Sequence, residues 1–330
     1  MGRVIFSRAT PGRAADMITS AGHLLKIWPG DTPPPAADLK RLLHEADGAL
    51  TMVTDQVSDE MLSGSPRLLI LANMAVGYDN INPVAAAAAG VWTTNTPGIL
   101  AETTADLAWA LLMAVARQVP QSERDTRAGG WKTWSPTAFL GSDIHGATIG
   151  IIGLGEIGTA MARRARGFGM RILYASGHRK PDLEAELGLE PASLDELLTT
   201  GDYISLHVPL NESTKALLGA REFALMKPTS ILINTARGGV IAQEALVEAL
   251  RFGRPGGAGL DVTDPEPLPL EHDLYSFENV VITPHIGSAS LATRSRMAEL
   301  AAENVIEVLA GRAPLTPVNY PAQPRPAMGR

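Results

Sequence analysis

The chain has 330 residues, of which 45% are hydrophobic and 19% are charged, and its formal net charge is −7. This length suits two domains, and the acidic balance argues against a nucleic-acid partner, because phosphate binding needs a basic surface. No apolar run is long enough to span a bilayer, and the first residues lack the features of a secretory signal. The sequence contains no cysteine, which excludes disulfides and thiolate chemistry. We therefore expect a cytoplasmic protein with no membrane partner.

Short apolar runs alternate with helical patterns in the first third of the chain. We expect strands at residues 4–7, 24–27, 49–53, 68–72 and 91–94, and helices at residues 11–20, 36–45 and 82–88. Such alternation predicts a parallel sheet with helices on its faces. Residues 31–35, with three consecutive prolines, predict a loop.

A long apolar helix is expected next, at residues 101–119, and its pattern suits an interface or a core equally well. The segment 129–146 is rich in Gly, Trp and Pro and predicts irregular structure. The alternation then restarts, with strands at residues 148–152, 170–174, 203–206, 230–234, 257–262 and 280–283, and helices at residues 156–167, 194–199, 221–226 and 242–252.

A last helix is expected at residues 290–309, before a proline-rich tail, residues 314–330, with no regular structure. The two series of alternating elements predict the fold class. We expect an α/β protein with two Rossmann-like or flavodoxin-like domains, each a doubly wound parallel sheet, and a cleft between them.

A glycine-rich motif with the pattern G-x-G-x-x-G follows the expected strand 148–152 and opens the expected helix 156–167. Its residues are Gly153, Leu154, Gly155, Glu156, Ile157 and Gly158. Between a strand and a helix this pattern predicts a dinucleotide-binding loop, because the glycines permit a tight turn and close approach of a pyrophosphate. The helix N-terminus supplies N–H groups for the phosphates. The alternative is a glycine-rich turn that binds no ligand.

The end of the following strand indicates which dinucleotide is bound. NAD enzymes place an acid there to hold the ribose 2′-hydroxyl, but the first acid in this segment is Asp182. Four residues can instead donate a hydrogen bond or supply positive charge to a 2′-phosphate: Ser176, His178, Arg179 and Lys180. We therefore expect NADP(H) to be preferred, with NAD(H) as the alternative cofactor. The alternative for Arg179 and Lys180 is a solvated turn.

Three chemically useful side chains follow three of the later strands: Arg237, Glu266 and His285. The carboxyl ends of parallel strands face the crevice of an open sheet, so these residues are expected to meet there. An arginine can grip a substrate carboxylate and polarise a keto oxygen, and a histidine can donate a proton. A glutamate beside the histidine keeps it charged. Each residue alone is more often an ordinary surface group, but together they suit reduction of a 2-keto acid.

These segments resemble the signatures of the D-isomer-specific 2-hydroxyacid dehydrogenases, most closely the glyoxylate/hydroxypyruvate reductase branch. The resemblance extends from residue 3 to about residue 319 and is carried by residues 72–80 (ANMAVGYDN), 94–97 (TNTP), 139–146 (FLGSDIHG) and 282–290 (ITPHIGSAS). It implies an enzyme that reduces glyoxylate to glycolate and hydroxypyruvate to D-glycerate with NADPH, without a metal.

The resemblance also implies residue roles. Arg237 is similar to the substrate-binding arginine, Glu266 to the acid that pairs with the histidine, and His285 to the proton donor. Further cofactor contacts implied are Thr104, Val208, Pro209, Thr214, Thr235, Ala236, Asp261 and Gly287. Substrate contacts implied are the backbone amides of Val76 and Gly77, which hold the carboxylate, and the pocket residues Met52, Val53, Met74 and Trp134. The chain departs from the pattern at Gly177, where related sequences often carry the arginine that binds the 2′-phosphate.

The family resemblance implies a discontinuous substrate-binding domain, residues 1–98 plus 290–330. The dinucleotide-binding domain, residues 99–289, is inserted into it and carries a dimerisation arm at about residues 101–146. We expect a homodimer in which Trp134 reaches into the partner's active site, with ordinary dimer packing as the alternative for this residue.

Three other functions remain as alternatives. A formate- or phosphite-type dehydrogenase is one, although the formate branch resembles a Gln–His pair where this chain has Glu266. A dinucleotide-sensing corepressor is the second, because such proteins share the fold and the Arg–Glu–His set does not exclude it. A methyltransferase could use the same glycine loop, but that set of residues gives it no support.

Overall fold

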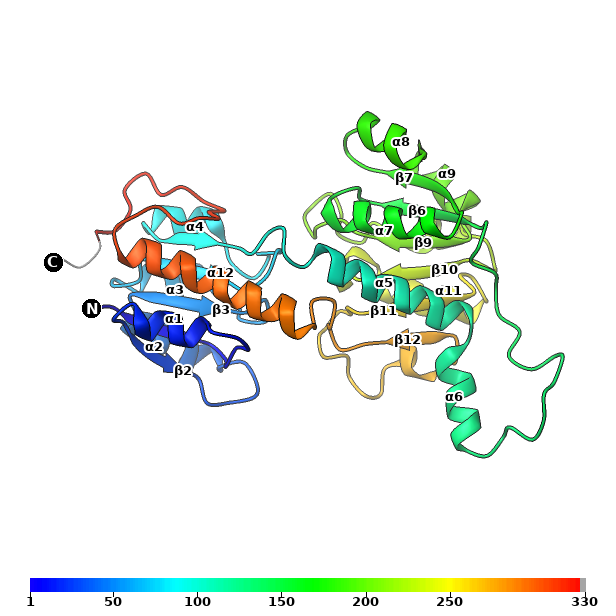
Figure 1. The fold of residues 1–330 in the computed structure, drawn as a ribbon, viewed down its shortest axis with the longest axis horizontal. Helices are drawn as coiled ribbons and strands as arrows, with labels where there is room; N and C mark the ends of the chain where they lie inside the picture. Colours follow the sequence, from blue (N-terminus) through cyan, green and yellow to red (C-terminus); the bar gives the residue numbers. More distant parts are fainter. Residues whose placement is uncertain (327–330) are drawn as a thin grey trace. The chain divides into compact units, whose positions relative to one another are not determined.

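The computed structural model describes residues 1–326 of the chain (Figure 1). It divides into two compact units. Unit 1 comprises Met1–Leu100 and Ser288–Arg330, and unit 2 comprises Ala101–Gly287. Each unit has its own parallel sheet. Among the described residues, no helix combines the length and the apolarity needed to cross a bilayer.

Unit 1 contains a five-stranded sheet. Its strands are β1 (Arg3–Phe6), β2 (Leu24–Ile27), β3 (Gly48–Thr51), β4 (Ile70–Asn73) and β5 (Trp92–Thr94). They pair in parallel in the order β2-β1-β3-β4-β5. This order is that of flavodoxin-like sheets, in which ligands bind at the carboxyl ends of the strands, where the strand order reverses. The reversal in unit 1 lies between β1 and β3.

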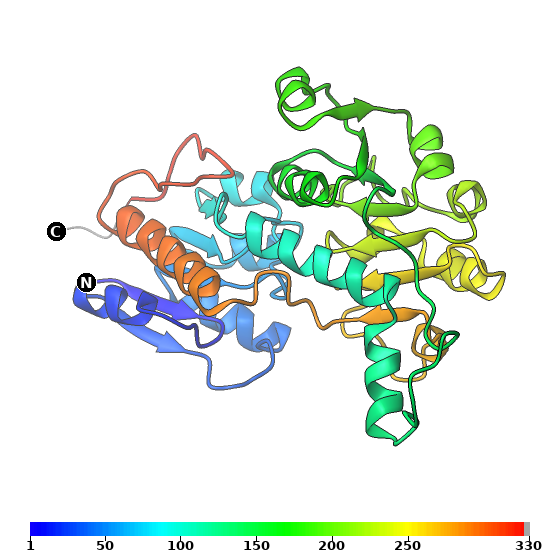
Figure 2. The ribbon, with the colours of Figure 1, turned by 45° about the vertical axis from the view of Figure 1, so that its right-hand side comes forward.

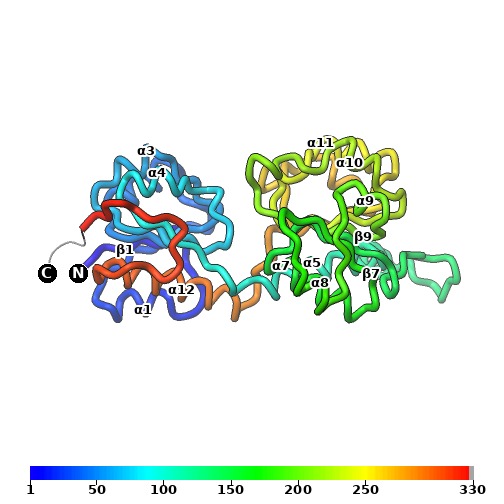
Figure 3. The backbone as a smooth tube through the Cα atoms, turned by 90° about the horizontal axis from the view of Figure 1, so that it is seen from above, coloured from blue at the N-terminus to red at the C-terminus, as the bar shows by residue number. Residues whose placement is uncertain are grey.

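Helices cover both faces of the unit 1 sheet (Figure 3). One face packs against α1 (Ala14–Ser20) and α12 (Leu291–Leu309), and the other packs against α2 (Ala36–Glu45), α3 (Asp59–Ser63) and α4 (Pro83–Ala88). Successive strand residues alternate between the two cores: Val4 and Phe6 pack with α1 and α12, whereas Ile5 packs on the opposite face. Because both faces of the sheet centre are covered, β3 and β4 are buried at every position, whereas the edge strand β2 is largely exposed.

The segment after α12 lies along unit 1 without forming a helix or strand as far as residue 326, as the sequence predicts. It is nevertheless fixed by buried hydrogen bonds. Asn319 accepts from the Thr93 amide at 2.8 Å and donates to the carbonyls of Pro83 and Val91 at 3.1 and 3.0 Å. Arg325 donates to the carbonyl of Leu68 at 2.9 Å. Residues 327–330 of the expected tail lie outside the described residues.

Unit 2 contains a seven-stranded parallel sheet. Its strands are β6 (Thr148–Ile152), β7 (Arg171–Ala175), β8 (Leu189–Pro191), β9 (Tyr203–Leu206), β10 (Ile231–Asn234), β11 (Gly257–Leu260) and β12 (Val280–Ile282). Their order is β12-β11-β10-β9-β6-β7-β8. Counted from β6 this is the order 3-2-1-4-5-6 of dinucleotide-binding folds, with one strand added. The strand order reverses between β6 and β9, which places the expected crevice beside the glycine loop.

Helices also cover both faces of the unit 2 sheet (Figure 3). The helices on one face are α5 (Ala101–Ala116) and α7 (Glu156–Gly167), with α8 (Pro181–Leu187) beside α7. The helices on the other are α9 (Leu194–Thr200), α10 (Ala220–Leu225) and α11 (Gln243–Arg251). Two short 3-10 helices, η1 (Gly238–Val240) and η2 (Asp273–Ser276), lie in loops. The predicted fold class, two doubly wound α/β domains with parallel sheets, is confirmed.

The prediction of one helix over residues 101–119 is wrong at its C-terminal end. Helix α5 ends at Ala116, Gln118 adopts a left-handed conformation with φ 51°, and a separate helix α6 (Val119–Arg127) follows. Pro120 explains the break, because proline lacks an N–H and is tolerated in the first turn of a helix but not in its interior. Residues 129–146 form no helix or strand, as predicted. Figures 1 and 2 show α6 and this segment projecting from the body of unit 2.

The prediction also omits the short elements α3, α8 and β8 and the 3-10 helices η1 and η2. The other predicted helices and strands are confirmed to within three residues at each end.

Candidate active site

The glycine loop after β6 forms an open backbone cradle at the start of α7. Gly153 has φ 94°, and a Cβ there would lie 2.6 Å from the carbonyl oxygen of His207. A Cβ on Gly158 would lie 2.1 Å from the carbonyl oxygen of Gly153. Gly155 precedes the first residue of α7, and a Cβ there would meet nothing within 4 Å. The loop therefore packs tightly on the protein side at two glycines and stays open at the third, as a pyrophosphate site requires.

A row of residues crosses the carboxyl end of the unit 2 sheet. The row, in spatial order, is Gly153, His207, Thr235 and Asp261, because the preceding residues are paired across β6, β9, β10 and β11. Two polar atoms in it, His207 Nδ1 and Thr235 Oγ1, are buried without a hydrogen-bond partner in the described part of the chain. Such atoms are rare in folded proteins and are usually satisfied by a water or a ligand. A nicotinamide dinucleotide fits this arrangement, with the cradle for its phosphates and polar atoms beside it.

His207 is the member of the row that sequence reasoning missed. Its Nε2 lies 2.8 Å from the Ser205 hydroxyl. Burial lowers the pKa of His207 to about 4, so its imidazole is neutral near pH 7. Its position in the sequence could have identified it as a candidate. His207 comes directly after β9, at the carboxyl end of a strand, where the other candidate residues of this sheet also lie.

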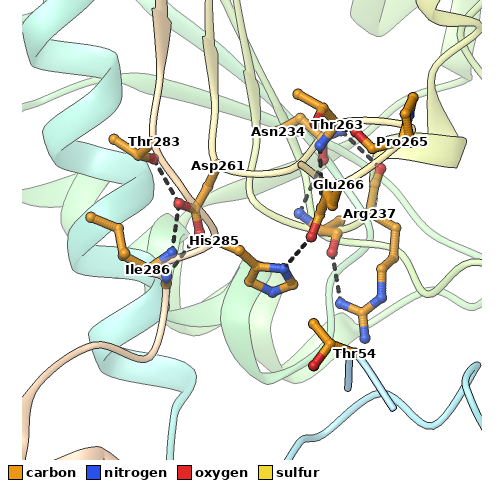
Figure 4. A network of polar contacts seen from close by, with 12 residues as sticks. Thr54, Asn234, Arg237, Asp261, Thr263, Pro265, Glu266, Thr283, His285 and Ile286 are labelled. Atoms are coloured by element: carbon orange, nitrogen blue, oxygen red, sulfur yellow. Dashed lines mark hydrogen bonds and ion pairs between the residues drawn. The ribbon is translucent and has the colours of Figure 1, made fainter. Parts of the chain in front are cut away.

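His285 and Glu266 are in direct contact. The imidazole Nδ1 lies 2.8 Å from Glu266 Oε2, and the two side chains are 34% and 31% exposed. The other carboxylate oxygen of Glu266 accepts from the Thr263 amide at 3.2 Å. Figure 4 shows this pair within one network of polar contacts. With Nδ1 fixed on the carboxylate, Nε2 is the ring nitrogen that can exchange a proton with a substrate.

The backbone of His285 is held in an uncommon conformation. Its φ is 53°, in the left-handed region, and its amide donates to the carbonyl of Asp261 at 3.0 Å. The Asp261 carboxylate accepts from Thr283 Oγ1 at 2.6 Å and from the amides of Ile286 and Gly287 at 2.8 Å each. Burial raises the pKa of Asp261, and these hydrogen bonds act in the opposite direction. Asp261 thus fixes the turn that presents the imidazole, and such backbone outliers cluster at functional sites.

Arg237 lies on a turn whose shape is set by its neighbours. Asn234 donates to the Arg237 carbonyl at 2.9 Å and accepts from the Ala236 amide at 3.0 Å. A Cβ on Gly238 would lie 2.0 Å from the carbonyl oxygen of Thr263, so only glycine allows this turn to pack on the loop of Glu266. In Figure 4, Arg237 and His285 lie on either side of Glu266. The structure thus brings the three residues into one part of unit 2.

The loop of Glu266 has an additional brace that the sequence did not reveal. The side chain of Gln243 donates to the Asp264 carbonyl at 2.7 Å and accepts from the Asp264 amide at 3.0 Å. This two-point contact from the first residue of α11 holds the backbone two residues before Glu266.

The remaining expected cofactor contacts in unit 2 lie near these groups or on the loop after β9. A Cβ on Gly287 would lie 3.2 Å from Thr104 Cγ2 and 3.3 Å from Asp261 Oδ2, so Thr104, Asp261 and Gly287 are neighbours. Val208, Pro209 and Thr214 are on the loop after β9, where the Thr214 hydroxyl donates to the Pro209 carbonyl at 2.5 Å. Ala236 is on the turn before Arg237.

The expected 2′-phosphate residues lie on an exposed segment between β7 and α8. Ser176, His178, Arg179 and Lys180 are all exposed. Arg179 Nε donates to Glu184 at 3.1 Å, and Glu184 also accepts from the Tyr174 hydroxyl at 2.5 Å. The first two carboxylates after β7 are those of Asp182 and Glu184. Both lie within α8, so neither is at the end of the strand.

The expected substrate contacts outside unit 2 lie at the carboxyl end of the unit 1 sheet. Met52 and Val53 follow β3, and Met74, Val76 and Gly77 follow β4; all five are half-buried. Trp134 lies instead on the projecting segment of unit 2, with 79% of its surface exposed. In the part of the chain that the structure describes, no cluster of His, Asp and Glu is arranged to hold a metal ion.

Comparison with known proteins identifies the family. Residues 109–287 match the model of the D-isomer specific 2-hydroxyacid dehydrogenase NAD binding domain. The chain belongs to the D-isomer specific 2-hydroxyacid dehydrogenases. It is 46% identical over 318 residues to a glyoxylate reductase of Korarchaeum cryptofilum, covering 96% of both chains. It is also 46% identical over 321 residues to a glyoxylate reductase of Thermococcus gammatolerans, again covering 96% of both.

Solved structures are also similar to this chain. The TT0316 protein of Thermus thermophilus superimposes with a TM-score of 0.91 at 46% identity, covering 96% of this chain and 99% of that one. An NADPH-dependent glyoxylate/hydroxypyruvate reductase of Sinorhizobium meliloti, solved with citrate, gives a TM-score of 0.83 at 32% identity, covering 98% and 100%. Membership of this dehydrogenase family establishes a nicotinamide dinucleotide as the class of cofactor.

Proposed function

We propose that this dehydrogenase reduces glyoxylate and hydroxypyruvate with NADPH, yielding glycolate and D-glycerate. The observation that carries the proposal is the His285–Glu266 contact beside Arg237, in the same unit as a glycine cradle that fits a dinucleotide. The names of the relatives at 46% identity support the choice of glyoxylate. The name of the S. meliloti structure supports hydroxypyruvate and NADPH.

The chemistry assigned to each residue follows from its surroundings. The bound cofactor supplies the hydride that the keto carbon accepts. His285 Nε2 delivers a proton to the keto oxygen, while Glu266 stabilises the imidazolium through Nδ1. Arg237 binds the substrate carboxylate and polarises the keto group. We assign the amides of Val76 and Gly77 to binding of the substrate carboxylate, and Met52, Val53 and Met74 to further contacts with the substrate.

We further assign unit 1 to substrate binding and unit 2 to dinucleotide binding. Gly153, Leu154, Gly155, Glu156, Ile157 and Gly158 would hold the phosphates. The polar row with Thr104, Ala236 and Gly287 would hold the nicotinamide half, and Val208, Pro209 and Thr214 the adenosine half. The open cradle and the two unpartnered buried atoms support these assignments.

A spectrophotometric assay tests the substrate assignment. Oxidation of NADPH and of NADH is measured with glyoxylate, hydroxypyruvate, pyruvate and phenylpyruvate. We expect the highest kcat/KM with glyoxylate or hydroxypyruvate and NADPH. Highest activity with phenylpyruvate would contradict the proposal of a small keto acid as the substrate. Tight dinucleotide binding without turnover of any of these acids would favour a dinucleotide-sensing corepressor instead.

The preference for NADPH rests on the exposed segment after β7. It offers Ser176, His178, Arg179 and Lys180 and places no carboxylate before α8. We expect Lys180→Glu to raise the KM for NADPH about tenfold or more and to leave the KM for NADH nearly unchanged, because only NADPH carries the 2′-phosphate. Lys26→Glu, at an exposed lysine on β2 of unit 1, serves as the charge-matched control. Equal effects of Lys180→Glu on both cofactors would overturn the assignment.

A further inference from the structure

The loop after β4 turns three successive carbonyl groups toward fixed donors. Ala75 O accepts from the Thr96 amide at 2.8 Å, Val76 O from Asn95 Nδ2 at 2.8 Å, and Gly77 O from Asn73 Nδ2 at 3.0 Å. Within residues 1–326, neither the Val76 nor the Gly77 amide has a hydrogen-bond acceptor.

The planarity of the peptide bond links these two observations. In a trans peptide the carbonyl of one residue and the amide of the next point in opposite directions. Holding Ala75 O on Thr96 therefore directs the Val76 N–H away from that contact, and holding Val76 O on Asn95 does the same for the Gly77 N–H. Successive backbone N–H groups without an internal acceptor can bind an anion where a turn brings them together.

The Asn73 carboxamide is buried and its orientation is fixed. Asn73 is 0% exposed at the end of β4, beside Thr51 at the end of β3. Its Oδ1 accepts from Thr51 Oγ1 at 3.3 Å, which leaves Nδ2 to donate to Gly77 O and to Asn80 Oδ1, the latter at 3.2 Å. Asn80 in turn donates to the carbonyls of Met52 and Asp55 at 3.0 and 2.9 Å, so the loops after β3 and β4 are tied together.

The backbone of Asn95 is anchored by the C-terminal segment. The Asn95 carbonyl accepts from Thr316 Oγ1 at 2.6 Å, and its amide donates to Thr316 O at 3.3 Å. The Thr316 amide donates to Asn304 Oδ1 at 3.0 Å, and Asn304 is 0% exposed on α12. A continuous set of hydrogen bonds thus runs from α12 to the peptide that carries the Gly77 N–H.

We propose that Asn95 and Asn73 are positioning residues that set the direction of the Val76 and Gly77 amides, and thereby the affinity for the carboxylate of the substrate. The inference rests on the proposed function, which assigns that carboxylate to these amides. Glycine has wide backbone freedom, so the peptides on either side of Gly77 rotate readily once the two carboxamides are removed. The loss should fall on binding of the carboxylate and not on proton transfer.

The test uses Asn95→Ala, Asn95→Asp and Asn73→Ala in the full chain with its cofactor. KM and kcat for glyoxylate are measured, together with inhibition by oxalate, a carboxylate that cannot be reduced. We expect Asn95→Ala and Asn73→Ala to raise the KM and the oxalate inhibition constant about tenfold, with kcat within about threefold of the unchanged chain. Asn95→Asp should raise both further, because it adds a negative charge beside an anion site. Thr94→Val is the matched control, since it removes a buried hydroxyl at the end of β5 that has no partner in the described chain.

Two controls separate a positioning role from a purely structural one. NADPH affinity, measured by fluorescence, reports folding of unit 2, and the midpoint of thermal unfolding reports folding of the whole chain. Variants with a lower melting midpoint but unchanged KM and oxalate affinity would overturn the proposal. If the unchanged chain binds oxalate but reduces no keto acid, the proposed function fails, while the oxalate comparison still decides the positioning role. If the unchanged chain does not bind oxalate, the positioning role of Asn73 and Asn95 is also overturned.

Discussion

Glu266 contacts the imidazole of His285 through one oxygen and its own loop backbone through the other. Glu266→Gln keeps the shape of the side chain but removes the negative charge that stabilises the imidazolium. We expect kcat/KM for glyoxylate to fall about 100-fold, because the imidazolium that donates the proton loses the carboxylate in contact with its Nδ1. Steady-state kinetics with glyoxylate and NADPH measure the loss. An unchanged kcat/KM would show that the carboxylate does not assist proton transfer from His285.

His207 gives a prediction about stability. Its pKa is lowered by burial to about 4, so between about pH 4 and pH 6.5 the unfolded chain binds a proton that the folded chain does not. The stability contributed by this residue is therefore present above pH 6.5 and is lost as the pH falls toward 4. At about pH 5 we expect the loss to be about 2 kcal/mol.

Chemical unfolding of the unchanged chain and of His207→Asn, at about pH 5 and about pH 7.5, measures this contribution. The variant should lose less stability between the two pH values than the unchanged chain. Equal losses in both proteins would contradict a neutral, buried imidazole.

At the scale of single elements, the start of α7 shows how closely the glycine loop is packed. Gly158→Ala would place a Cβ 2.1 Å from the carbonyl oxygen of Gly153, so we expect at least tenfold weaker NADPH binding and a stability loss of about 1–3 kcal/mol. Gly167→Ala makes the same substitution at the last residue of α7, where a Cβ meets nothing within 4 Å. It should stabilise the helix by up to about 1 kcal/mol. Fluorescence titration and thermal unfolding distinguish the two; equal NADPH affinity in both would contradict the cradle.

Elements with strong local signals were predictable from the sequence. The strand before the glycine loop and the helix after it have the predicted bounds, Thr148–Ile152 and Glu156–Gly167, because apolar period and glycine spacing agree there. The apolar pattern predicts a helix to residue 119, but α5 ends at Ala116 because Gln118 adopts a left-handed conformation that the pattern does not reveal. Helix α3 has only five residues, too few for its period to be recognised, although Ser58 caps it.

Parts of the candidate site depend on contacts between segments that are distant in sequence, and these could not be predicted. Arg237, Glu266 and His285 were named from their positions after strands. The two-point contact of Gln243 with Asp264 joins residues 21 apart, and the Asn73 contact with Gly77 depends on loop geometry. Asp261 was interpreted as a cofactor contact, and its hydrogen bonds to the His285 turn emerge only from the fold.

For the whole molecule, the projecting segment of unit 2 predicts self-association. Trp131, Trp134 and Leu140 are 71%, 79% and 68% exposed on it, and large apolar side chains exposed to this extent are candidates for an interface. We propose that this arm and α6 form the interface of a homodimer. Sedimentation of the double variant Trp131→Ser, Trp134→Ser should show a shift toward monomer. Phe252→Ser, at an 85% exposed aromatic after α11, should leave the dimer intact. A monomeric unchanged chain would contradict the proposal.

The most direct test of the account is the kcat/KM of His285→Ala for NADPH-linked reduction of glyoxylate, with NADPH affinity measured on the same sample. If the imidazole at the end of β12 donates the proton, kcat/KM should fall about 1000-fold while NADPH affinity stays unchanged. Retention of kcat/KM within about tenfold of the unchanged chain would contradict the assignment.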